Sequence, residues 1–116
     1  MLNFPRELNV CGRVYTVKEE QDLRGDGNQS LWGEFRDDTG EIVLGTHHNG
    51  RVSTPTEMTH TFFHELCHAI LDEACPALTA MLPDGSKEDW IDSFASLWSD
   101  TVVRNGLFVL PEEDAR

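Results

Sequence analysis

The first half of the chain alternates apolar and polar positions over short stretches, as β-strands do. Residues 10–18 (VCGRVYTVK) are rich in β-branched and aromatic side chains and predict one strand. Two further strands are expected at residues 31–36 and 41–44, with a hairpin turn at residues 37–40 (DDTG) between them. Residues 45–53 are polar and irregular, so no regular element is expected there.

The second half of the chain has the spacing of helices, with clear signals at the helix ends. Residues 54–57 (TPTE) supply a capping hydroxyl, a proline at the first helical position and a glutamate three residues after the cap, which together form a capping box. This helix is expected to extend to about Ala74, because Pro76 would stop it. A second helix is expected from its cap at Ser86 to about Asn105. Strands followed by two helices predict an α+β fold.

Size and composition favour one folded domain over residues 1–116. The chain has 116 residues, of which 39% are hydrophobic, and this is enough for a single domain with its own core. Trp32, Trp90 and Trp98 are expected to belong to that core. Residues 111–116 (PEEDAR) are expected to form a frayed acidic tail. A monomer is favoured, although the sequence leaves the oligomeric state open.

The charge balance and the cysteines narrow the class of partner and the compartment. Lys and Arg number 9 and Asp and Glu number 21, which gives a formal net charge of −12. Nucleic acids and anionic membranes are bound through Lys and Arg, so neither is expected as a partner. The sequence also has no apolar run of about 18 residues that would span a membrane. The cysteines show no CxxC spacing and the N-terminus lacks a signal-peptide core, so a cytoplasmic protein is expected.

The candidate chemistry lies in the first predicted helix, at residues 64–68 (HELCH). This stretch matches H-E-x-x-H, in which two histidines one helical turn apart can bind the same metal ion. On a helical wheel, His64 and His68 fall at the edge of the apolar arc, which would place them in the wall of a cleft. The alternative interpretation is two histidines on an exposed flank of the helix. Cys67 points toward the apolar arc and is expected to be a buried residue rather than a metal ligand.

A hydrolytic zinc site usually has three protein ligands and one open position, so a third ligand is needed. No third histidine follows His68 at short spacing, which favours a carboxylate from the second helix. Glu88 and Asp92 lie four residues apart at the edge of that helix's apolar arc, whereas Asp89 points away and suits a capping role. We predict Glu88 as the third ligand and Asp92 as an acceptor for the N–H of a ligand histidine. The alternative for Glu88 is an acidic residue that is favoured in a first helical turn by the helix dipole.

With these residues the sequence resembles the zincin metallopeptidases, specifically the gluzincins, in which a downstream glutamate joins the two histidines of H-E-x-x-H. Glu88 follows His68 by 20 residues, a spacing similar to that of thermolysin-like enzymes. In size and layout the chain looks more like the compact ImmA/IrrE-like and phage-encoded metallopeptidases, which have a short strand, here residues 41–44, before the motif helix. The resemblance covers about residues 31–104 and departs from that family's E-A-N-x-F-A pattern, since EDWIDSFA stands at residues 88–95.

The resemblance implies a zincin-like fold, in which a small, mostly antiparallel sheet packs on an active-site helix and a second, C-terminal helix. It also implies Zn²⁺ bound by His64, His68 and Glu88, a peptide or protein substrate, and hydrolysis by a metal-activated water with Glu65 as general base. The substrate would bind as an extra strand beside residues 41–45. An oxyanion donor is also implied, and the candidates are Tyr15, His47, His48 and His60.

Two other classes of function remain open from the sequence. The chain could be a metal-binding regulatory or structural module that derives from a peptidase and binds zinc without catalysis. It could also be an interaction domain in which the motif of residues 64–68 arose by chance. The zinc content of the protein and the effect of changing Glu65 would separate these hypotheses.

Overall fold

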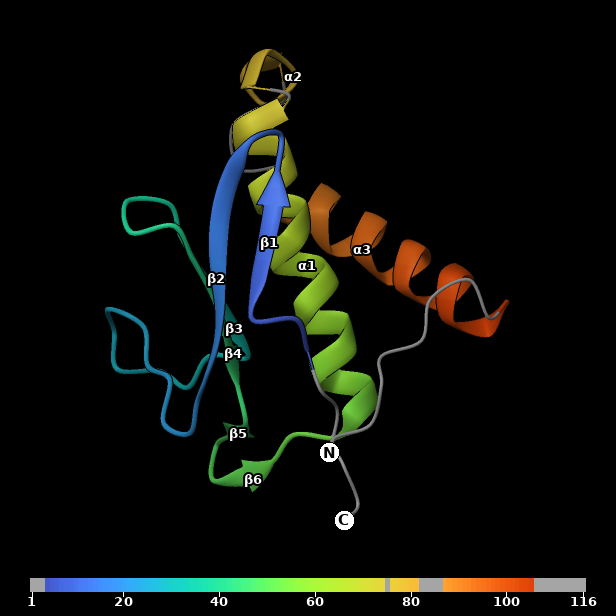
Figure 1. The fold of residues 1–116 in the computed structure, drawn as a ribbon. Helices are drawn as coiled ribbons and strands as arrows, with labels where there is room; N and C mark the ends of the chain where they lie inside the picture. The colour runs from blue at the N-terminus through green and yellow to red at the C-terminus, as the bar shows by residue number, and fades with distance from the viewer. Residues whose placement is uncertain (1–3, 75, 82–86, 106–116) are drawn as a thin grey trace.

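The computed structural model describes residues 4–74, 76–81 and 87–105, which form small sheets and three helices (Figure 1). The predicted α+β class is confirmed for this part of the chain. The strands are β1 (Glu7–Val10), β2 (Arg13–Glu20), β3 (Gly33–Arg36), β4 (Glu41–Gly45), β5 (His47–His48) and β6 (Arg51–Val52). The helices are α1 (Pro55–Ala74), α2 (Pro76–Met81) and α3 (Lys87–Arg104).

The four longer strands form one mixed sheet in the order β1-β2-β4-β3. The two outer pairs, β1 with β2 and β3 with β4, are antiparallel, as the expectation of a mostly antiparallel sheet requires. The central pair, β2 with β4, is parallel. This parallel pair arises because residues 21–32 lead from the end of β2 to the outer strand β3. The turn at residues 37–40 then returns the chain to the position beside β2 (Figure 1).

The structure differs from the predicted strands at two tight turns. The strand expected at residues 10–18 is interrupted by Cys11 and Gly12, whose φ angles of 52° and 94° form the turn between β1 and β2. Asn49 and Gly50, with φ angles of 53° and 80°, form a similar turn, so β5 and β6 replace the irregular segment that was expected. Two successive positive φ angles suit a two-residue hairpin, and Asn-Gly is a strong signal for one. Cys-Gly is a weaker signal, because the β-branched pattern continues on both sides of it.

The first predicted helix is confirmed together with its capping box. The backbone N–H of Thr54 donates to Oε1 of Glu57 at 2.8 Å, and the N–H of Glu57 donates to Oγ1 of Thr54 at 3.1 Å. Pro55 is the first residue of α1. Pro76 follows the end of this helix as expected, but it also begins the short helix α2, which was not predicted from the sequence. A proline is well suited to a first helical position, because its missing N–H would have no helical partner there.

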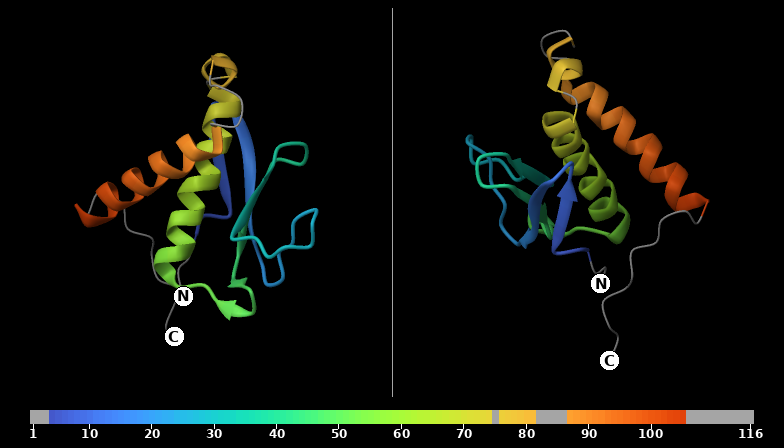
Figure 2. Two further views of the ribbon diagram at one scale, coloured as in Figure 1. Left: turned by 180° about the vertical axis from the view of Figure 1, so that it is seen from behind. Right: turned by 45° about the horizontal axis from the view of Figure 1, so that its top comes forward.

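Helix α1 lies between the sheet and α3, so it is covered on two sides (Figure 2). The buried core therefore draws on strands and helices alike. It contains Phe4, Val10, Tyr15, Val17, Ile42, Leu44, Phe62, Phe63, Cys67, Ala69, Leu71, Ile91 and Ala95. The predicted burial of Cys67 is confirmed. None of the helices in the described residues has the length and apolar character that a membrane span requires.

Helix α3 confirms the predicted second helix, although its expected cap Ser86 and the tail at residues 111–116 lie outside the described residues. It packs on α1 through Ile91 and Ala95, which are fully buried. The expected apolar arc of this helix is only partly buried. The side chains that remain open to solvent are Trp90, Phe94 and Leu97, which are 39%, 45% and 70% exposed.

The expectation that all three tryptophans belong to the core is therefore wrong. Trp90 and Trp32 are both exposed, whereas Trp98 is half-buried against the core. The reason for Trp90 is geometric, since a helix that packs mainly on one neighbour buries a narrow stripe of its surface rather than a wide arc. Trp90 instead stacks on Phe94, with ring centroids 5.2 Å apart.

Candidate metal centre

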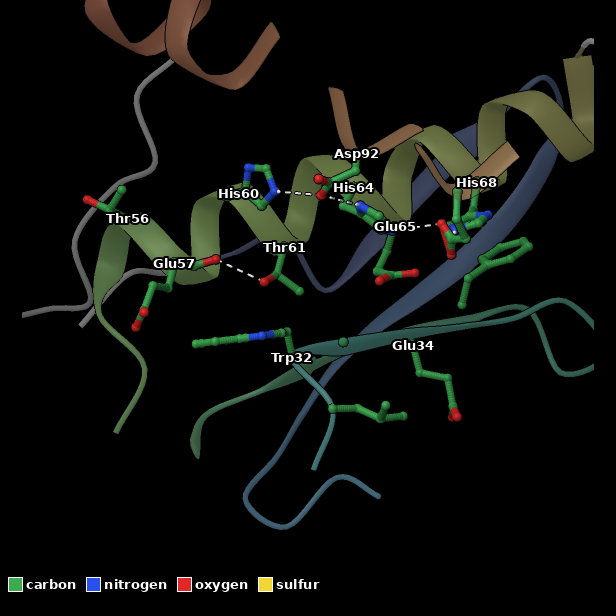
Figure 3. Close-up of a pocket in the computed structure, with 14 residues that line it drawn as sticks. Trp32, Glu34, Thr56, Glu57, His60, Thr61, His64, Glu65, His68 and Asp92 are labelled. Atoms are coloured by element: carbon green, nitrogen blue, oxygen red, sulfur yellow. Dashed lines mark hydrogen bonds and ion pairs between the residues drawn. The ribbon is translucent and has the colours of Figure 1, made fainter. Parts of the chain in front are cut away.

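The H-E-x-x-H segment lies in the middle of α1, and its two histidines point to the same side of that helix. The ring centroids of His64 and His68 are 5.3 Å apart. Their side chains are 19% and 13% exposed and line a surface pocket, so they lie neither in the core nor on an open flank. His60 extends this row by one more turn, with its ring centroid 6.4 Å from that of His64 (Figure 3).

Glu88 of α3 faces both rings of the histidine pair. Its Oε1 atom lies 3.0 Å from Nε2 of His68, and its Oε2 atom lies 3.4 Å from Nε2 of His64. Zinc forms bonds of about 2.0–2.2 Å to these atom types, so two ligands of a tetrahedral zinc are separated by about 3.3 Å. The distances from Glu88 to the imidazoles are of this size. Each contact uses a different oxygen of Glu88. Two imidazoles and one carboxylate are the donor set of many hydrolytic zinc sites, so the chemistry of these residues fits the metal.

Glu65 points into the space between α1 and β3 and is only 6% exposed (Figure 3). Burial in the first place, and then the negative charges of Glu88 and Glu34, raise the pKa of Glu65 to about 8. Glu65 and the two motif histidines offer ligand atoms that all lie within 4.8 Å of one another. Burial also lowers the pKa of His68, which favours the neutral ring that binds metal. A carboxyl group in this position is suited to proton transfer beside a metal ion.

Asp92 lies one turn after Glu88 on α3 and faces the other nitrogen of His64. Its Oδ1 atom is 3.7 Å from Nδ1 of His64 and 3.5 Å from Nε2 of His60. Asp92 therefore faces a ligand histidine as predicted, but the distance of 3.7 Å is too long for a good hydrogen bond. His60, His64 and Asp92 form a second group whose ligand atoms lie within 4.8 Å of one another.

Gly33, the first residue of β3, lets this strand approach α1 closely. A Cβ atom at Gly33 would lie 2.4 Å from Cγ2 of Thr61, 3.0 Å from the carbonyl oxygen of Val43 and 3.2 Å from Oε2 of Glu65. A larger residue would therefore push β3 away from the carboxylate of Glu65. Gly33 was not predicted as a site residue from the sequence, although a glycine inside a predicted strand is a signal for close backbone approach.

The histidines and acids line a pocket of about 750 Å³ between α1, α3 and β3. The strand at this pocket is β3, which is an outer strand of the sheet, whereas β4 lies between β2 and β3. The expectation of a substrate-binding edge at residues 41–45 is therefore wrong, because the hairpin places β4 inside the sheet. The residues that line the pocket are Leu31, Trp32, Gly33, Glu34, Phe35, Thr56, Glu57, His60, Thr61, His64, Glu65, His68, Glu88 and Asp92.

The four candidates for an oxyanion donor lie in different places. Tyr15 is fully buried in the sheet, away from the pocket lining. His47 and His48 belong to β5, and the ring of His48 stacks on Trp32 at a centroid distance of 3.8 Å. His60 is the one of these four that lines the pocket. His60 lies beside Asp92, and its role as an oxyanion donor stays a prediction.

Comparisons of the chain with known protein families, with curated proteins and with solved structures find no match. The geometry of the pocket is therefore the basis for a proposed function.

Proposed function

We propose that this protein is a zinc-dependent peptidase of the zincin type, with His64, His68 and Glu88 as the zinc ligands. The observation that carries the proposal is the contact of Glu88 with Nε2 of both histidines. A motif that arose by chance in a structural helix would need no acid from a second helix between its two imidazoles. Glu65 supports the same interpretation, because it is a buried carboxyl group with no structural ion pair to explain its burial among the interactions of the described residues.

A bound zinc ion would act as a Lewis acid toward the substrate carbonyl and would lower the pKa of a water molecule to about 7. Glu65 would accept a proton from that water as its oxygen bonds to the carbonyl carbon. The C–N bond then breaks, and Glu65 gives the proton to the leaving amine, which restores its carboxylate. The charge of a zinc ion bound by His64, His68 and Glu88 would favour the carboxylate form of Glu65, which is the form that accepts a proton.

The outer strand β3 supports an extended peptide as the substrate. An outer strand has backbone N–H and C=O groups that a further strand can pair with, and this mode of binding asks little of the side chains. Trp32 and Phe35 add apolar surface on the same side of the pocket. Gly33 keeps β3 close to Glu65, so a peptide bound along β3 would pass the catalytic carboxylate.

The zinc content and peptide hydrolysis of the purified protein test this proposal. Elemental analysis should find tightly bound zinc, and a mixture of peptides analysed by mass spectrometry should show cleavage. The Glu65→Gln variant should retain zinc but cleave at least about 1,000-fold more slowly, because its amide accepts no proton. Asp72→Asn is the matched control, since Asp72 lies on the same helix but contacts Lys87 at 3.3 Å and is not part of the pocket lining.

Two results would contradict the proposal. A folded sample that binds no zinc would remove its basis. A zinc-loaded sample that cleaves no peptide would leave a metal-binding module without catalysis, which is the other class of function that the sequence allows.

A further inference from the structure

The proposed peptidase uses His64 and His68 as zinc ligands, but it assigns no metal ion to His60, which extends the same row of histidines on α1. Across from His60 and His64 lies Asp92 of α3, one turn beyond Glu88 (Figure 3). We propose that Nε2 of His60, Nδ1 of His64 and Oδ1 of Asp92 form a second site for a divalent transition-metal ion. This site goes beyond the proposed function, since hydrolysis does not require it.

The distances within this cluster favour a shared ion over direct hydrogen bonds. Oδ1 of Asp92 is 3.5 Å from Nε2 of His60 and 3.7 Å from Nδ1 of His64. Good hydrogen bonds between nitrogen and oxygen are about 2.7–3.2 Å long, so both contacts are long for that role. Two ligands of one tetrahedral zinc ion are about 3.3 Å apart, and both contacts of Asp92 lie within about 0.4 Å of that separation. The ligand atoms of all three residues lie within 4.8 Å of one another.

The chemistry of the donors selects the class of ion. Imidazole nitrogens with one carboxylate suit Zn²⁺, Co²⁺ or Ni²⁺, whereas Mg²⁺ and Ca²⁺ prefer oxygen ligands. Nδ1 of His60 lies 3.5 Å from Oγ of Ser96, a neighbouring group that can orient the ring. His60 is half-buried and Asp92 is exposed, so water would complete the coordination. We therefore expect this site to bind more weakly than the site at His64, His68 and Glu88.

The two sites share His64 and must compete for it. Glu88 faces Nε2 of His64 at 3.4 Å, whereas Asp92 faces Nδ1 of the same ring. A neutral imidazole has a lone pair on one nitrogen and a proton on the other, so it binds one metal ion at a time. An ion at the second site would thus weaken zinc binding at the first site. If the proposed function is correct, excess metal would inhibit the peptidase through this competition.

Titration of the metal-free protein with Co²⁺, followed by visible absorption, tests the second site. The His68→Ala variant removes a ligand of the first site only. It should still bind Co²⁺, and the visible absorption should be that of a Co²⁺ ion with a low coordination number. Adding His60→Ala to that variant should weaken Co²⁺ binding at least about 100-fold, because a direct ligand is lost and even outer partners of a ligand contribute 10–100-fold. His60→Ala alone is the matched control and should keep the first site. Circular dichroism of each variant checks that it is folded.

The outcomes separate this inference from the proposed function. The second site is wrong if folded His68→Ala protein binds no Co²⁺, or if His68→Ala binds Co²⁺ equally well with and without His60→Ala. Loss of all Co²⁺ binding in His60→Ala alone would instead contradict the zinc ligands of the proposed peptidase. Retained binding in His68→Ala that disappears in the double variant supports the second site whether or not the protein cleaves peptides.

Discussion

Oε1 of Glu88 lies 3.0 Å from Nε2 of His68, although the two residues are 20 positions apart in the sequence. The contact joins the motif helix α1 to the C-terminal helix α3, and both residues line the pocket. It depends on how these helices pack, because Ile91 and Ala95 fix α3 against α1 and thereby set the direction of the Glu88 side chain. The geometry of the proposed metal centre therefore depends on the packing between α1 and α3.

Replacing Glu88 tests this relationship most directly. Glu88→Gln keeps the size of the side chain but removes the charge that a zinc ligand supplies. Zinc affinity should fall at least about 100-fold, measured by competition with a chromophoric chelator. Asp89→Asn is the matched control, because Asp89 is the next residue on α3 and is not part of the pocket lining. Equal zinc affinity in the two variants would show that Glu88 is not a ligand.

Gly33→Ala should disturb the approach of β3 to α1. The added methyl group would lie 2.4 Å from Cγ2 of Thr61, so β3 must move away or the core must strain. We expect a loss of about 1–3 kcal/mol in the free energy of unfolding, as for other overpacked sites. Urea unfolding measures this loss, and peptide cleavage should fall with it because Glu65 would lose its neighbour.

A second substitution shows whether the contact with Thr61 is the cause. Thr61→Ser removes the methyl group at Cγ2 but keeps the hydroxyl that donates to the carbonyl oxygen of Glu57 at 2.9 Å. In the double variant, part of the stability lost in Gly33→Ala should return, with a coupling of at least about 0.5 kcal/mol. Full additivity of the two changes would mean that the strand and the helix do not meet at this point.

Tyr15→Phe should reduce stability without affecting hydrolysis. The Tyr15 hydroxyl is buried and donates to Oε1 of Glu73 at 2.7 Å, away from the pocket lining. Loss of a hydrogen bond to a charged group should cost about 1–2 kcal/mol in urea unfolding. The kcat/KM of peptide cleavage should stay unchanged at temperatures where the variant is folded. A tenfold loss of kcat/KM at unchanged stability would instead return Tyr15 to the list of catalytic groups.

The start of α1 should make stability depend on pH in the acid range. The hydrogen bond from Arg51, followed by that from the backbone of Thr54, lowers the pKa of Glu57 from 4.5 to about 2. A carboxyl group with a depressed pKa in the folded state contributes stability that is present above pH 4.5. This contribution is lost as the pH falls from about 4.5 to about 2. Urea unfolding at a series of pH values should show this loss in the wild-type protein.

Two variants identify the source of that pH dependence. Glu57→Gln should flatten the profile between pH 4.5 and 2, because no carboxyl group remains to titrate. Arg51→Gln should move the loss of stability to higher pH, since the largest cause of the lowered pKa is removed. A wild-type profile that matches Glu57→Gln across this range would show that the capping box does not depend on the charge of Glu57.

Local patterns predict the central helix well. The capping box at residues 54–57 and the stop at Pro76 depend on neighbouring residues only, and α1 has the expected bounds. The common direction of His64 and His68 follows from the helical repeat in the same way. The turn at Cys11 and Gly12 was missed for a related reason, since no residue type at that position demands a turn as strongly as Asn-Gly does.

Contacts between distant segments were harder to predict. The sequence shows two strands joined by a turn at residues 37–40, but not which of them pairs with β2. The outer position of β3 follows from the path of residues 21–32, and that path places Gly33 and Trp32 at the pocket. The apolar arc of α3 likewise gives no sign that Trp90 and Phe94 would be exposed, because their exposure depends on how much of α3 the packing against α1 covers.

The sequence by itself determined the long helix, its capped start and the pair of histidines on one of its faces, because each depends on residues within a few positions of one another. Only the tertiary structure decided that Glu88 and Asp92 face opposite nitrogens of His64, and that β3 rather than β4 borders the pocket. These relationships join segments far apart in the chain. They are set by the burial of α1 between a sheet and a second helix, which no local pattern specifies.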